Sequence, residues 1–151
     1  MSGLLSNIRV LDLSRVLSGP WATQMLADFG ADVIKVERPG IGDDVRQQGS
    51  RLKDLDGNDT DERSTFLALN RGKRSVTIDM ATAGGQALIR RLAAASDVVV
   101  ENFKSGDLAR YGLDHASLAR VNPKLVYCSI TGFGQSGPYS HLPGYDLIFQ
   151  S

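Results

Sequence analysis

The chain has 151 residues, of which 42% are hydrophobic and 23% are charged, and its 17 basic residues balance its 17 acidic residues. This length and composition fit one globular domain that buries its own core, and they exclude the disordered, fibrous and membrane-spanning classes. The balanced charge gives no indication of a nucleic-acid or membrane partner. The start lacks a basic and then apolar leader, which predicts a cytoplasmic protein.

The only cysteine is Cys128, within the apolar run 126–130. A single cysteine cannot form an internal disulfide, which suits a reducing compartment. Its apolar neighbours predict a buried, unreactive thiol rather than a nucleophile.

The first elements form a strand, helix and strand in that order. Residues 8–13 alternate apolar and polar and predict a strand, and Ser18-Gly19-Pro20 then opens a helix that runs to about residue 29. Gly30 supplies the stop, and residues 31–37 predict a second strand. This order implies a right-handed crossover between parallel strands.

The middle of the chain is less regular. Residues 42–62 are polar and show no periodicity, so we expect a long surface loop that serves as a lid or an assembly segment. A short apolar patch at 66–69 precedes a predicted strand at 75–79. Thr82 is a candidate N-cap for an amphipathic helix whose apolar positions are Leu88, Ile89, Leu92 and Ala95.

The last third returns to alternating elements. Predicted strands at 97–101 and 124–130 enclose two short helical stretches, at 108–111 and 115–121, and a glycine-rich loop occupies 131–138. Residues 146–151 look like the first turns of a helix without a stop signal, so we expect the chain to end before a second domain. The whole pattern predicts an α/β fold with a mainly parallel, Rossmann-like sheet flanked by helices, in which ligands bind at the carboxyl ends of the strands.

Several common catalytic and cofactor motifs are missing. The first crossover ends in the acidic Glu37, but its turn carries only Gly19 and cannot be written as G-x-G-x-x-G, which argues against NAD or FAD binding. There is no P-loop, no G-x-S-x-G elbow and no cluster with metal-ligand spacing, so we expect no metal. His115 and His141 lie among polar residues and are interpreted as solvated surface residues.

Basic residues next to predicted strand ends are more informative. They are Arg38, the pair Lys73-Arg74, Lys104 and Arg110. If these positions share one edge of the sheet, the cations converge there and suit a polyphosphate ligand. The alternative is that most of them are solvated surface charges.

A set of short motifs in register resembles the class III CoA-transferases of the CaiB/BaiF type. The motifs are VLDL (10–13), SGP (18–20), ADVIKVERP (31–39), NRGKRS (70–75), VENF (100–103), GFG (132–134), GP (137–138) and GYD (144–146). That family includes formyl-CoA, carnitine-CoA and succinyl-CoA-dependent transferases and the α-methylacyl-CoA racemases. The resemblance covers nearly the whole chain.

The resemblance implies that residues 1–151 form an amino-terminal CoA-binding domain. Val16 and Leu17 match the loop along the CoA path, Arg38 matches a basic residue near the nucleotide end, and Arg110 matches a phosphate contact. Asn102 and Phe103 match the segment beside the nucleotide, although a strand-end cap and a core aromatic are equally good interpretations. Lys73, Arg74 and Lys104 are further candidate contacts.

The family's nucleophile is an aspartate in a Gly-Asp or Thr-Asp motif, which the resemblance places beyond Ser151. Asp146 and Tyr145 are therefore expected to line the site rather than to perform catalysis. Racemases carry a histidine where this chain has Tyr145, and an unionised phenol is a poor base, so a transferase is favoured over a racemase.

The ligands implied are acyl-CoA and a small carboxylic acid, and the implied assembly of the full-length protein is an interlocked homodimer. A racemase-like enzyme, a CoA-dependent lyase and an inactive CoA-binding fragment remain as alternatives.

Overall fold

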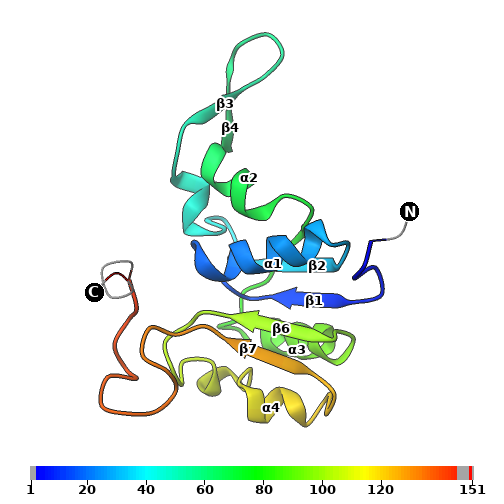
Figure 1. Ribbon diagram of the computed structural model, residues 1–151, viewed down its shortest axis with the longest axis vertical. Coiled ribbons are helices and arrows are strands. Elements are labelled where there is room, and N and C mark those ends of the chain that lie inside the picture. The colour runs from blue at the N-terminus through cyan, green and yellow to red at the C-terminus, as the bar shows by residue number, and fades with distance from the viewer. Residues whose placement is uncertain (1–2, 146–149, 151) are drawn as a thin grey trace.

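The computed structural model describes residues 3–145 and residue 150. Their main feature is a five-stranded, entirely parallel sheet in the order β5-β2-β1-β6-β7 (Figure 1). The strands are β1 (Arg9–Asp12), β2 (Asp32–Glu37), β5 (Arg74–Thr77), β6 (Val98–Glu101) and β7 (Val126–Ser129). The predicted α/β fold with a parallel sheet is confirmed.

Helices cover both faces of this sheet. On one face, α1 (Ser18–Asp28) packs Leu26 over Val10, Val33 and Val100. On the other face, α3 (Ala83–Ala94) and α4 (His115–Ala119) pack against a second cluster that is centred on Leu11 and Val99. Successive strand residues therefore serve opposite cores, as the alternation of side chains along a strand requires.

Two of the predicted helix ends are confirmed, the start of α3 at Thr82 and the end of α1 before Gly30. The Thr82 hydroxyl accepts a hydrogen bond of 3.0 Å from the Gly85 N–H and caps α3. Gly30 follows α1 with a φ of +99°, which ends the helix at little steric cost. A 3₁₀ turn, η2 (Ala109–Tyr111), lies within the first of the two short helical stretches that were predicted.

The prediction of an unstructured loop at 42–62 was wrong. This segment contains a 3₁₀ turn, η1 (Asp44–Gln47), and a two-stranded hairpin of β3 (Arg51–Lys53) and β4 (Asp59–Arg63), which projects from the rest of the molecule in Figure 1. The apolar patch at 66–69 belongs to α2 (Ser64–Asn70). The hairpin escaped prediction because its strands are only three and five residues long and carry mostly charged side chains, which leaves too few apolar positions to show a period of two.

The prediction that Cys128 is buried was also wrong. Cys128 is exposed, and its neighbour on the same face of β7, Val126, is 60% exposed. The cause is position: β7 is an edge strand, and α1 packs against β1, β2 and β6. The helix predicted at 146–151 lies outside the described residues, and no described helix is long and apolar enough to span a bilayer.

Candidate functional site

The carboxyl ends of β1, β2, β6 and β7 meet at one end of the sheet, and the last described residues lie at this end (Figure 1). Hollows form there because the loops that leave these strands diverge to opposite faces. Cavities lie at or beside this end of the sheet, and the two described first share Arg15 of the β1–α1 loop.

The arginine cavity, named for three of its residues, has a volume of about 260 Å³. Its lining consists of Leu13, Arg15, Val36, Glu37, Arg38, Gly42, Asp43, Asp79, Met80, Ala81, Phe103, Asp107, Arg110 and Tyr111. The lining combines apolar side chains with three arginines and four carboxylates. The apolar surface and the arginines suit a ligand with a flat apolar part and phosphate groups.

The loop cavity has a volume of about 440 Å³ and lies between the β1–α1 loop and the segment after β7. Its lining includes Val16, Leu17, Asn102, Lys104, Ile130, Leu142 and Tyr145. Arg15, Phe103 and Asp107 line both cavities, so the two hollows share a wall. A third, lateral cavity of about 590 Å³ lies beside them and shares Lys104 and Ser105 with the loop cavity.

The β1–α1 loop has a fixed conformation at this junction. Asn102 holds Arg15 from one side: its Oδ1 accepts from the Arg15 N–H at 2.8 Å, and its Nδ2 donates to the Arg15 carbonyl at 2.7 Å. Val16 has a φ of +68°, a conformation that β-branched residues rarely adopt and that is found mainly at functional sites. Asn102 thus serves chiefly as a clamp on this loop.

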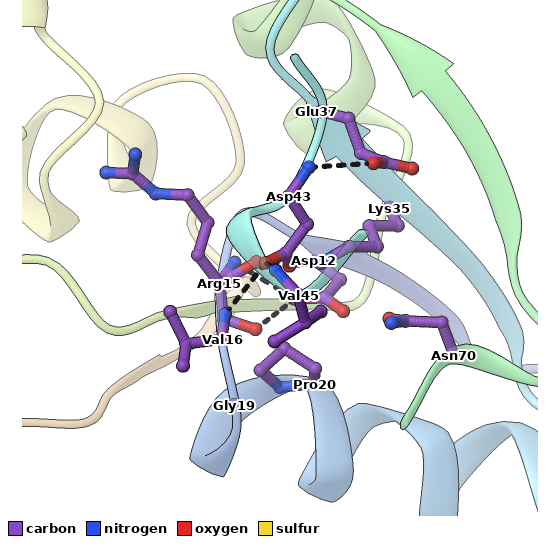
Figure 2. Close-up of polar contacts among 12 residues, drawn as sticks. Asp12, Arg15, Val16, Gly19, Pro20, Lys35, Glu37, Asp43, Val45 and Asn70 are labelled. Atoms are coloured by element: carbon purple, nitrogen blue, oxygen red, sulfur yellow. Dashed lines mark hydrogen bonds and ion pairs between the residues drawn. The ribbon is translucent and has the colours of Figure 1, made fainter. Parts of the chain in front are cut away.

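A buried ion pair holds the same loop from the other side (Figure 2). The Lys35 side chain is 1% exposed, and its Nζ lies 2.8 Å from Asp43 Oδ2 and donates to the Ser14 carbonyl at 2.9 Å. Asp43 Oδ1 accepts from the N–H groups of Val16, at 3.1 Å, and Val45, at 3.2 Å. The loops after β1 and β2 are therefore joined through one carboxylate.

Glu37 is occupied by protein groups. Arg46 donates to both of its carboxylate oxygens, at 2.6 and 2.8 Å, and Ser75 and the Asp43 N–H add further hydrogen bonds. Burial alone would raise the pKa of Glu37, but the hydrogen bonds from Arg46 and Ser75 outweigh it and lower the pKa to about 2. Both carboxylate oxygens of Glu37 are therefore engaged by protein groups.

Two of the predicted basic contacts do not face either cavity. Lys73 is 2% exposed in its side chain, and its Nζ donates to Asp12 Oδ2, the Pro20 carbonyl and Asn70 Oδ1 at 2.8–2.9 Å. Burial lowers the pKa of Lys73 to about 8, with Asp12 opposing the shift. All three ammonium donors are used, so Lys73 supports the fold and has none left for a phosphate.

Arg74 lies at the amino end of its strand, away from the cavities. It begins β5 and donates to Asp32, at the start of β2, at 2.7 and 2.9 Å. The expected convergence was wrong for both Lys73 and Arg74. Lys73 reaches the carboxyl end of β1, but its ammonium is buried and bonded to protein groups, whereas Arg74 lies at the amino end of β5. The convergence holds for the basic residues that follow β2 and β6, which are Arg38, Lys104 and Arg110.

The three basic residues that do line the cavities, Arg38, Arg110 and Lys104, differ in how far protein groups already engage them. Arg38 pairs with Asp44 and donates to the Gly42 carbonyl at 3.2 Å. The Arg110 guanidinium lies 4.7 Å from the centre of the Tyr111 ring, and Lys104 is exposed. Tyr145 lines the loop cavity and is 70% exposed, whereas Asp146 lies outside the described residues.

The sequence-based prediction missed Arg15, which stands where the two cavities meet, with its guanidinium 4.4 Å from the centre of the Phe103 ring. Its position directly before the strained Val16, in a loop at a strand's carboxyl end, was the available signal. His115 and His141 are exposed, as predicted, and within residues 3–145 no cluster of side chains could hold a metal ion.

Comparisons with known proteins find relatives over nearly the whole chain. The family model described as CoA-transferase family III matches residues 5–151. A succinate–glutarate CoA-transferase of Agrobacterium fabrum is 57% identical over 97% of this chain and 36% of its own length. A formyl-CoA:oxalate CoA-transferase of Escherichia coli is 40% identical over the whole of this chain and 35% of its own length.

Solved structures give the same result. A crystal structure of a CaiB/BaiF family protein from Brucella suis superposes with a TM-score of 0.91 and 50% identity, over 99% of this chain and 39% of the other. A Mycobacterium tuberculosis protein reaches a TM-score of 0.86 at 41% identity. The chain spans about a third of the length of the curated relatives that it matches.

Proposed function

Because this chain belongs to CoA-transferase family III, we propose that the gene product transfers CoA from an acyl-CoA thioester to a carboxylic acid, and that residues 1–151 supply much of the CoA site. The observation that carries this proposal is the pair of adjoining cavities at the carboxyl edge of the sheet. One has three arginines in its lining and the other is lined by Tyr145, which suits an elongated ligand with a phosphate-bearing end.

The two cavities suggest an orientation for the ligand. The nucleotide end would occupy the arginine cavity, where Arg38 and Arg110 can bind phosphate and Met80 and Phe103 offer apolar surface. The pantetheine arm would continue past Phe103 into the loop cavity, along Val16 and Leu17. The acyl group then lies near Tyr145, the family's site-lining position.

The proposed chemistry is covalent catalysis by an aspartate, as the family resemblance implies. Its carboxylate attacks the thioester carbonyl, CoA leaves as a thiolate, and an acyl-aspartyl anhydride forms. The thiolate attacks the aspartyl carbonyl of the anhydride, which releases the donor acid and leaves an enzyme-bound thioester. The acceptor carboxylate then displaces the thiolate, and the thiolate attacks the acceptor's carbonyl, which regenerates the aspartate and releases the new acyl-CoA.

Two observations favour CoA transfer over proton exchange at the α-carbon, the racemase alternative. Several relatives are named as CoA-transferases with dicarboxylic acid substrates, including the succinate–glutarate and oxalate enzymes. The chain also carries Tyr145 where racemases have a histidine, and a phenol is a poor base near neutral pH. These relatives make a small carboxylic acid, and a dicarboxylic acid in particular, the proposed acceptor.

We also propose a second domain and an interlocked homodimer for the full gene product. The outer side of α1 supports this assembly: Leu17, Trp21, Met25 and Phe29 recur every four residues and are 41–56% exposed. Such a continuous apolar stripe is characteristic of an interface.

Calorimetric titration of the full gene product with CoA tests the binding part of this proposal. Arg38→Gln removes one charge from the arginine cavity and is expected to raise the Kd about ten- to a hundred-fold, because a charge-assisted hydrogen bond is worth about 1.5–3 kcal/mol. Arg91→Gln, on the exposed side of α3, removes the same charge far from the cavities and serves as the control.

The reaction is then tested with succinyl-CoA and glutarate. Formation of glutaryl-CoA supports the transferase. Solvent deuterium exchange at the α-carbon of a 2-methylacyl-CoA, without transfer to any acid, would instead support a racemase. Absence of any CoA binding by the intact gene product would refute the proposed function as a whole.

A further inference from the structure

Arg15 and Arg110 are the two arginines of the arginine cavity whose guanidinium groups make no hydrogen bond or ion pair with any described residue, whereas Arg38 pairs with Asp44. Of these two, Arg110 is exposed, and Arg15 is partly buried where the two cavities meet. From this geometry we infer that Arg15 is a binding residue for an oxyanion of the bound thioester, either its diphosphate or the distal carboxylate of a dicarboxylic acyl group. This inference rests on the proposed function and names one contact within it.

Hydrogen bonds hold the backbone of Arg15 and of the residue that follows it. Both its N–H and its carbonyl are bonded to the amide of Asn102, and the next N–H, of Val16, donates to Asp43. Figure 2 shows the Arg15 side chain extending away from the buried polar residues that hold its backbone. A charged group held on so rigid a loop loses little conformational freedom when a ligand binds.

The surroundings of the guanidinium favour an anion. It is half-buried against the face of Phe103, with its charged carbon 4.4 Å from the ring centre, and Arg38 is close enough to repel it. Burial and that repulsion lower the pKa of Arg15, while Asp43, Asp44 and Asp107 oppose the shift without contacting the side chain. The negative charge of a ligand oxyanion would offset both the desolvation of Arg15 and its repulsion by Arg38.

The position of Arg15 between the two cavities indicates which part of the ligand it would contact. Arg15 lies in the wall shared by the arginine cavity and the loop cavity. A thioester that extends through both cavities must pass this point between its nucleoside and its acyl group. The planar guanidinium fork can bind two oxygens of one phosphate or carboxylate at once, and lysine cannot reproduce this geometry.

The test is calorimetric titration of the full gene product and its Arg15→Gln variant with CoA, acetyl-CoA and succinyl-CoA. We expect Arg15→Gln to weaken binding about ten- to a hundred-fold for at least one ligand, and Arg15→Lys to recover only part of the loss. Arg91→Gln is the control and should leave all three affinities unchanged. The urea midpoints of the variants should lie close to that of the unaltered protein, because the side chain makes no hydrogen bond or ion pair in the fold and loses only its contact with the Phe103 ring, a small contribution at a partly exposed site.

The three ligands distinguish the two sources of the oxyanion. Equal losses for all three ligands assign Arg15 to the diphosphate, and a loss confined to succinyl-CoA assigns it to the distal carboxylate. Unchanged affinities in Arg15→Gln, with normal binding by the unaltered protein, overturn the inference and leave the proposed function standing. No binding of CoA by the unaltered protein overturns both.

Discussion

Removal of one member of the buried Lys35–Asp43 pair should destabilise the protein strongly. Asp43→Asn keeps the size of the side chain and an oxygen that can accept from Val16 and Val45, but it leaves the Lys35 ammonium charged and uncompensated at 1% exposure. Breaking a buried pair in this way costs about 3–5 kcal/mol. A domain of this size has a free energy of unfolding of about 5–15 kcal/mol, so the loss is large.

A double-mutant cycle separates the ion pair from other effects. Lys35→Met removes the ammonium and keeps an unbranched chain, so the double variant contains no unpaired buried charge. We expect the double variant to lose less free energy of unfolding than the two single variants lose together. The difference should be at least about 2 kcal/mol in urea unfolding of the full gene product. The surface pair Lys53–Asp59, with side chains 63% and 52% exposed, is the matched control, and Asp59→Asn should cost less than about 1 kcal/mol.

The cycle also has a clear negative outcome. If the Lys35 and Asp43 variants are additive within about 0.5 kcal/mol, the two charges do not interact in the folded protein. If Asp43→Asn lowers the free energy of unfolding as little as Asp59→Asn does, burial of the Lys35–Asp43 pair adds nothing to its contribution to stability.

Two further predictions concern stability. The folded pKa of Glu37, about 2, lies below its ordinary value of 4.5, so its stabilising contribution is complete above about pH 4.5 and is lost as the pH falls toward 2. A shift of this size corresponds to about 3 kcal/mol at neutral pH, so Glu37→Gln should lower the free energy of unfolding by up to that amount at pH 7 and by almost nothing at pH 2, and equal losses at both values in urea titrations would contradict it. In α3, a Cβ added at Gly85 would lie 1.8 Å from the Asp79 carbonyl oxygen, whereas one at the neighbouring Gly84 meets nothing within 4 Å. Thermal unfolding should therefore show Gly85→Ala destabilised by more than about 1 kcal/mol and Gly84→Ala stabilised by about 0.5–1 kcal/mol, and the same sign for both would refute the steric explanation.

The sequence predicted those features that depend on neighbouring residues. The parallel strands, the cap at Thr82 and the stop at Gly30 follow from patterns a few residues long, and the structure confirms them. Cys128 was wrongly placed because exposure on an edge strand depends on which helix covers it, and no local pattern records that.

The candidate site was predicted in part. Arg38, Lys104, Phe103 and Arg110 line the cavities, because residues that follow parallel strands gather at one edge. Lys73 was interpreted as a ligand contact because its partners, such as Asp12, are distant in sequence and the buried ion pair gives no local signal. Arg15 was missed for a related reason: what makes it available is the absence of a partner, which only a three-dimensional structure reveals.

The strand order also affects how the chain folds during synthesis. β1 emerges first but lies at the centre of the sheet, and its amino end contacts residues far along the chain, such as Arg9 with Asp97, which are 88 positions apart. At about 5–20 residues per second, a ribosome needs roughly 4–18 s to cover that distance. Until β6 has been synthesised, the backbone groups on the side of β1 that receives it have no native partner, so the pairing of β1 with β6 at the centre of the sheet is a late, non-local step of folding.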